Sequence, residues 1–82
     1  MADGPDALYA RRIIVEELTE AIDELPEKQR EVFVMHEIED KSFKEISELT
    51  GESVNTLLSR KRYAVLYLRK RLREMYTEFI NN

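Results

Sequence analysis

Residues 42–62, SFKEISELTGESVNTLLSRKR, contain the signals for two helices joined by a tight turn. Ser42 and Glu45 form the capping-box pattern S-x-x-E, which satisfies backbone donors at a helix start. Gly51 stands where that helix must stop and where a left-handed residue is favoured. Ser53 is then placed to cap a second helix. A helix, a tight turn and a second helix with polar and basic residues is the layout of a DNA-reading helix-turn-helix.

The charge is distributed unevenly along the chain. The whole chain has 13 basic and 17 acidic residues, net −4, which argues weakly against a nucleic-acid partner. Residues 1–52 have a net charge of −9, with 6 Lys/Arg and 15 Asp/Glu, whereas residues 53–82 have +5, with 7 and 2. A basic segment that coincides with the second helix is typical of a phosphate-binding surface. The alternative is the solvated basic face of an ordinary bundle helix.

Length and composition indicate one small helical domain. The chain has 82 residues, 43% of them hydrophobic, with only two Gly and two Pro. Cys is absent and His36 is the single histidine, so we expect no disulfide, no metal site and no cofactor. No constellation of catalytic groups is visible, so we do not expect an enzyme. The absence of a long apolar run or a leader pattern predicts a cytoplasmic protein.

The helical periodicity extends on both sides of this motif. We expect residues 1–5 to be the disordered end of a linker and residues 6–82 to form the domain. Helices are predicted over about 6–25, over about 27–37, from Ser42, and over 53–80, the last roughly 42 Å long. The prediction is therefore an all-α, four-helix domain that contains a helix-turn-helix with a long C-terminal recognition helix.

Two apolar stripes predict how the first and last helices pack. The first stripe consists of Leu8, Val15, Leu18, Ile22 and Leu25. The second consists of Val54, Leu57, Lys61, Val65, Leu68, Leu72, Met75 and Phe79, with Lys61 as its only polar member. The second stripe could also be a coiled-coil seam, but it spans under four heptads and the other helices need a surface to pack on, so intramolecular packing is favoured.

Residues 25–72 resemble the C-terminal DNA-binding domain, region four, of extracytoplasmic-function sigma factors of bacterial RNA polymerase. Residues 25–33 match its LPxxxREVF opening, residues 42–51 its SYxEIAxxLG helix, and residues 54–60 its VGTVKSR segment. This chain departs from the family at Ser53, Asn55 and Leu58, where the family usually has Pro, Gly and a basic residue. The promoter-melting region two is absent, so we expect the chain to be a fragment of a longer sigma factor, with a free-standing region-four protein as the less favoured alternative.

The resemblance implies binding of the −35 promoter element and docking on RNA polymerase in transcription initiation. It implies double-stranded promoter DNA, the RNA polymerase core and an anti-sigma factor as partners, and no membrane. Two alternatives stay open at this point. One is a helix-turn-helix output domain of the response-regulator type. The other is a helical interaction module that binds an anti-sigma-like protein and no DNA.

The candidate DNA-binding residues follow from the helical phase, with Ile46 and Leu57 taken as buried. Asn55 is suited to pair with adenine, and Arg60 or Arg62 with guanine or phosphate. Leu58 is suited to contact a thymine methyl or to rest on a sugar. Lys41 and Lys44, with the amide end of the third helix, are expected to hold flanking phosphates. The full set is Lys41, Ser42, Lys44, Ser53, Asn55, Thr56, Leu58, Ser59, Arg60 and Arg62.

Overall fold

Four α-helices and one π-helical turn account for most of the chain. The structure is a computed structural model that describes residues 4–81, except for the side chains of residues 79 and 81. Its elements are α1 (Pro5–Asp23), α2 (Glu27–Phe33), the π-helical turn η1 (Val34–Ile38), α3 (Phe43–Thr50) and α4 (Val54–Asn81). No strand occurs among these residues, and the all-α prediction with a long C-terminal helix is confirmed.

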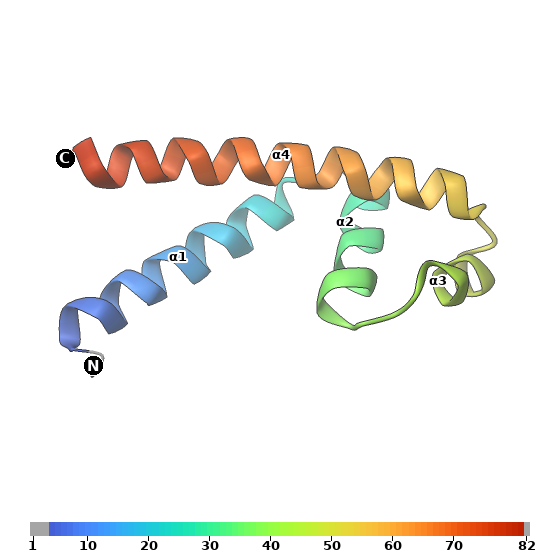
Figure 1. The fold of residues 1–82 in the computed structure, drawn as a ribbon, viewed down its shortest axis with the longest axis horizontal. Coiled ribbons are helices and arrows are strands. Elements are labelled where there is room, and N and C mark those ends of the chain that lie inside the picture. The colour runs from blue at the N-terminus through green and yellow to red at the C-terminus, as the bar shows by residue number, and fades with distance from the viewer. Residues whose placement is uncertain (1–3, 82) are drawn as a thin grey trace.

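Helix α4 forms the long axis of the molecule. It runs along one edge of the molecule, and α1, α2 and α3 all lie on the same side of it (Figure 1). The molecule is correspondingly elongated, with principal extents of 45 × 25 × 18 Å. The helix continues unbroken for 28 residues because residues 54–81 contain neither Gly nor Pro. The predicted bounds, 53–80, agree with the observed ones to one residue.

Two small cores attach the other helices to α4. Ala21, Leu25, Ala64 and Leu68 form the first core, where the end of α1 meets the middle of α4. Val32, Ile46 and Leu57 form the second, where α2 and α3 pack on the first turns of α4. The second core fixes the relative orientation of the two helices of the helix-turn-helix.

A polar network on the surface joins α1 to α4 beside the first core. The Arg71 Nε donates to Glu24 Oε1 at 2.7 Å, and the Tyr67 hydroxyl donates to the same oxygen. The Arg30 side chain donates a hydrogen bond to the backbone carbonyl of Leu25 at 3.0 Å. This carbonyl lies just after the end of α1, where the helix itself offers no donor. The end of α1 is therefore held by both apolar and charged contacts.

The Glu24 network predicts that the domain loses stability in acid. Hydrogen bonds from Arg71 and Tyr67 hold the pKa of the Glu24 carboxyl below its ordinary value of 4.5. Such a carboxylate stabilises the folded state above about pH 4.5, and this contribution is lost as pH falls through the lowered pKa. We expect the melting temperature to fall on acidification, and to fall less steeply in Glu24→Gln, as thermal denaturation at a series of pH values will measure.

Part of the acid sensitivity is expected to persist in that variant. Lys61 lowers the pKa of Glu37, and the backbone amide of Ser42 lowers the pKa of Glu45. Glu16→Gln is the matched control, because Glu16 forms no ion pair with any residue that the structure describes. Superimposable pH profiles for the parent and Glu24→Gln would contradict the assigned role of this network.

Helix α1 differs from its prediction at both ends and along its apolar stripe. It begins at Pro5 rather than Asp6 and ends at Asp23 rather than Leu25, so Pro5, which the prediction groups with the linker, is the first helical residue. Residues 1–3 of the predicted linker, residue 82 of the predicted domain and the Phe79 side chain lie outside what the structure describes. Leu8 and Val15 are 54% and 57% exposed, because α1 diverges from α4 toward its N-terminus (Figure 1).

The second predicted helix, over 27–37, changes its winding midway. It is α-helical only to Phe33, and a π-helical turn then continues to Ile38, with the amide of Glu39 donating to the carbonyl of Val34 at 3.0 Å. Asp40 follows with a positive φ of 57°, a conformation that Asp tolerates better than most residues. The wider turn places the ring of His36 on that of Phe43, with 4.1 Å between centroids.

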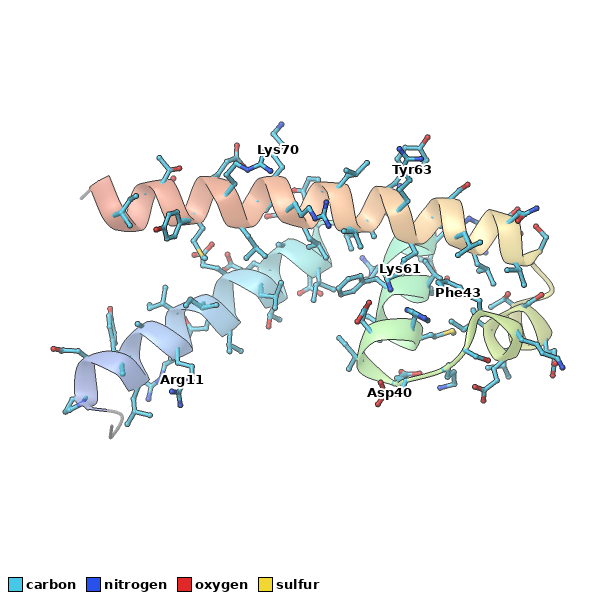
Figure 2. The ribbon with its side chains drawn as sticks, in the orientation of Figure 1. Arg11, Asp40, Phe43, Lys61, Tyr63 and Lys70 are labelled. Atoms are coloured by element: carbon cyan, nitrogen blue, oxygen red, sulfur yellow. The ribbon has the colours of Figure 1, made fainter. Side chains whose placement is uncertain are left out.

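Lys61 lies on the inner side of α4, as the apolar stripe predicts, and its charge is compensated there. Only 13% of its side chain is exposed. Its ammonium donates to Glu37 Oε1 and to His36 Nδ1, both at 2.5 Å, and lies 5.8 Å from the centre of the Phe43 ring (Figure 2). His36 is thus a half-buried packing residue, as predicted, and it accepts a hydrogen bond from the one cation of the stripe.

Candidate nucleic-acid interface

The helix-turn-helix is built from α3, the turn at residues 51–53 and the first turns of α4. The capping box is present as predicted: the Glu45 amide donates to Ser42 Oγ at 3.1 Å, and the Ser42 amide donates to Glu45 Oε1 at 2.9 Å. Gly51 has a φ of 78°, the left-handed conformation that a glycine adopts at little cost. Ile46 and Leu57 are buried against each other and thereby define which side of α4 faces outward.

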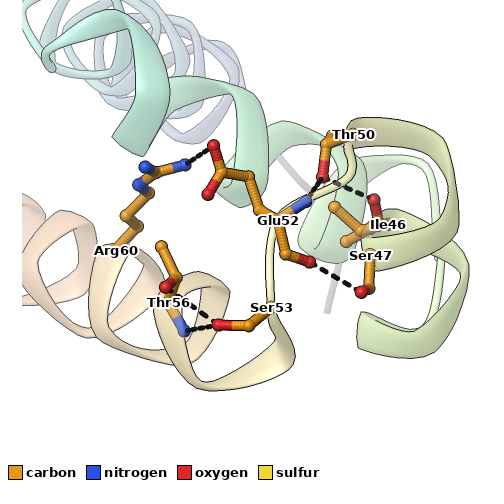
Figure 3. A network of polar contacts seen from close by, with 7 residues as sticks. All are labelled: Ile46, Ser47, Thr50, Glu52, Ser53, Thr56 and Arg60. Carbon is orange, nitrogen blue, oxygen red and sulfur yellow. Dashed lines mark hydrogen bonds and ion pairs between the residues drawn. The ribbon is translucent and has the colours of Figure 1, made fainter.

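A chain of hydrogen bonds holds the turn (Figure 3). The Ser47 hydroxyl donates to the carbonyl of Glu52 at 2.6 Å, and the Glu52 amide donates to Thr50 Oγ1 at 3.2 Å. The Thr56 amide donates to Ser53 Oγ at 3.1 Å, so Ser53 caps α4 as predicted. These bonds join polar groups of the turn to residues of α3 and α4. The start of α4 is therefore held in one position relative to α3.

The outward side of α4 carries most of the predicted contact residues. Asn55, Ser59 and Arg62 follow one another at helical steps of four and three, so they share one face. Thr56 lies at its margin, half-buried, with its hydroxyl accepting a hydrogen bond from Ser53 at 2.9 Å. The exposed predicted residues at the start of α4 and at its cap are called here the reading face: Ser53, Asn55, Leu58, Ser59 and Arg62.

Leu58 is an apolar residue within the polar reading face. Its side chain is 45% exposed, whereas its neighbour Leu57 is only 2% exposed. The helical phase predicted from the sequence is therefore confirmed at this pair. The departure of Leu58 from the basic residue usual in the resembling family places an apolar side chain on the surface and not in the core.

Arg60 does not belong to the reading face. The sequence analysis predicts that Arg60 contacts guanine or phosphate, and in the structure 27% of its side chain is exposed. Its Nη1 lies 3.5 Å from Glu52 Oε1 (Figure 3), and both residues line a small recess between α2, η1, α3 and α4. The Arg60 guanidinium therefore pairs with Glu52 at the turn, whereas Asn55 and Arg62 are exposed on the outward side of α4.

The residues predicted to hold flanking phosphates differ in how free their charges and donors are to contact a phosphate. Lys44 is exposed and forms no ion pair among the described residues. Lys41 lies 2.6 Å from Glu39 Oε1, which neutralises part of its charge. The amide of Ser42 is occupied by the Glu45 carboxylate, so it has no hydrogen left for a phosphate. Of this group, Lys44 is the side chain best placed for a phosphate contact.

Two acidic residues that pair with cations of α4 are not among the residues singled out from the sequence. Glu52 positions Arg60, and its only sequence signal is an acidic residue directly before the cap of α4. Glu37 pairs with Lys61, and the signal for this contact is the single cation in an apolar stripe, which requires a nearby carboxylate. Both contacts are tertiary, so local sequence spacing does not reveal them.

No metal site and no membrane-spanning helix is found in the part of the chain that the structure describes. Residues 4–81 contain no cluster of three or more His, Cys, Asp or Glu side chains that could hold a metal ion. Within the same residues, no helix combines the length and the apolar character needed to cross a bilayer.

Comparison with known proteins identifies a family and a relative of the chain. Residues 15–68 match the family described as "Sigma-70, region 4". Over 56 residues, the chain is 38% identical to the RNA polymerase sigma factor SigV of Bacillus subtilis (strain 168). That match covers 68% of this chain and 34% of the relative, so the chain spans about a third of the length of that protein. No solved structure gives a significant match.

Proposed function

The chain belongs to the sigma-70 region 4 family, a DNA-binding domain of RNA polymerase sigma factors, and from this membership we propose that it binds the −35 element of a promoter. The same membership disfavours the alternative of an output domain of the response-regulator type. We further propose that the chain is of the extracytoplasmic-function type, that it works within a longer sigma factor, and that it acts in the cytoplasm.

The exposed position of Asn55 on the reading face is the observation that carries this proposal. In a helix-turn-helix, the first residues of the second helix approach base edges in the major groove. The amide of Asn55 can pair with the N6 and N7 atoms of adenine, and the guanidinium of Arg62 with guanine or with a phosphate. Asn55 and Arg62 lie two turns apart on one face, so a single groove can accommodate both.

Selection of bound sequences from a pool of random duplexes tests this proposal. We expect the full chain to enrich one short sequence and to bind it with an affinity that falls steeply with salt. Contacts to about three to five phosphates imply a slope of log affinity against log salt of about −3 to −4. Fluorescence anisotropy with the enriched duplex and with a scrambled duplex measures both properties.

Two outcomes would contradict promoter reading. Failure to enrich any sequence would leave only non-specific attraction, and an affinity independent of salt would remove the electrostatic basis of binding. Either outcome would favour the remaining alternative, a helical module that binds a protein such as an anti-sigma factor.

Docking on the RNA polymerase core is the second part of the proposal. The first half of α1 is available for such a contact, because Leu8, Ile14 and Val15 are exposed there beside acidic residues of the same helix. Repeating the selection with core RNA polymerase present tests docking. The same sequence should then be enriched at a lower concentration of the chain, and an unchanged concentration would contradict docking.

A further inference from the structure

The exposed side of α4 continues beyond the reading face as a basic surface. Arg62, Leu66, Arg69 and Arg73 follow Asn55 and Ser59 at alternating helical steps of three and four, and all are exposed. Lys70 is exposed at the margin of the same face. We call the part formed by Arg69, Lys70 and Arg73 the outer basic patch. It lies on the same face of the same helix as Asn55.

The charges of the outer basic patch are available to a partner. Among the described residues, none of the three side chains forms an ion pair or hydrogen bond. Arg71, in the same basic run, is different: it turns inward and binds Glu24 at 2.7 Å, with Glu17 at 3.8 Å. The fold thus uses one cation of the run for its own packing and leaves the other three in solvent.

No helix covers this side of α4 in the described part of the chain. The contacts of α4 with α1, α2 and α3 are made by the opposite face, where Ala64 and Leu68 are buried. In Figure 2, Lys70 and Tyr63 project away from the three other helices. A long partner can therefore lie along the whole outer side of α4.

The length of α4 determines which partner fits. Arg69 and Arg73 lie about 10.5 and 16.5 Å beyond Arg62 along the helix axis. The major groove turns around the duplex once in roughly 34 Å, so a straight helix leaves the groove after its first few turns. As it leaves, its outward side crosses the phosphate backbone that borders the groove.

We propose that the outer basic patch binds the phosphate backbone of DNA next to the element that Asn55 contacts. This inference rests on the proposed function, and it extends the DNA footprint to the second half of α4. Arginine suits such a contact because its planar guanidinium donates two parallel hydrogen bonds to phosphate. An acidic protein surface is the other partner class for a basic patch. DNA is favoured because the patch shares its face with Asn55, so a protein there would compete with the duplex for space.

Arg69→Gln/Arg73→Gln tests the proposal in the full chain. Loss of two phosphate contacts should reduce the magnitude of the salt slope by about two and weaken binding roughly 10- to 30-fold near physiological salt. The preference for the selected duplex over a scrambled duplex should stay unchanged, since phosphate contacts carry no sequence information. Lengthening a minimal duplex by about one helical turn, roughly 10 base pairs, should strengthen binding of the parent but not of the variant.

The matched control is Arg12→Gln/Lys28→Gln, which removes two exposed cations from α1 and α2. Its salt slope should equal that of the parent. Equal slopes for the parent and Arg69→Gln/Arg73→Gln would overturn the inference and leave an acidic protein as the partner of the patch. In that case the parent would still select a sequence, and the proposed function would stand. A parent that selects no sequence and ignores salt would overturn both.

Discussion

Leu57→Ala is expected to lower the free energy of unfolding by about 2–5 kcal/mol. Leu57 is 2% exposed and packs with Val32 and Ile46, so its truncation leaves a cavity at the junction of three helices. Small domains have a total stability of only about 5–15 kcal/mol, so the loss would be a large fraction of it. Thermal or urea denaturation followed by circular dichroism measures the change.

Leu58→Ala is the control for this prediction, because it removes the same atoms one position along the helix. Leu58 is largely on the surface, and the free energy of unfolding should change by less than about 0.5 kcal/mol. Equal stabilities for Leu57→Ala and the parent would mean that the inner and outer sides of α4 have been assigned wrongly. The assignment of Asn55 and Arg62 to the reading face would then be lost as well.

The features of the fold that the sequence predicts correctly are those with local causes. The capping box at Ser42 and Glu45, the left-handed Gly51 and the cap at Ser53 each depend on residues within one helical turn. The unbroken α4 follows from the absence of Gly and Pro. These local signals suffice to place Leu57 inside and Leu58 outside, which determines the reading face.

The features that the sequence does not predict depend on contacts between distant elements. Nothing in residues 34–38 marks a π-helical turn, which forms where His36 can stack on Phe43 and accept a hydrogen bond from Lys61. The exposure of Leu8 depends on the angle between α1 and α4, and the helical period of α1 contains no information about that angle.

Arg60 illustrates the same limit within the candidate site. Its type and its place at the start of a recognition helix favour a DNA contact. The recess beside Glu52 gives it an alternative partner within the fold, and only the tertiary structure reveals this. The DNA-binding roles of Asn55, Ser59 and Arg62 stay predictions, although the structure places all three in solvent on one side of α4.

Leu58 is the position where a single change should strengthen DNA binding. Its side chain is 45% exposed, so a lysine there can keep its ammonium in water. Arg62 lies four residues further along the helix, and two like charges at this spacing cost only a few tenths of a kcal/mol. The melting temperature of Leu58→Lys should therefore stay close to that of the parent. A large drop would show that the residue is buried when the domain is in solution.

Leu58→Lys is expected to steepen the salt slope by about one unit and to raise the affinity for non-specific duplex roughly fivefold at physiological salt. The added ammonium can neutralise one more phosphate, while the loss of the apolar side chain removes any contact with a thymine methyl. Discrimination between the selected and scrambled duplexes should consequently weaken. Leu8→Lys, the same change on the exposed first half of α1, should leave the slope unaltered. An equal effect of the two changes would mean that net charge, and not the position of Leu58 on the reading face, governs binding.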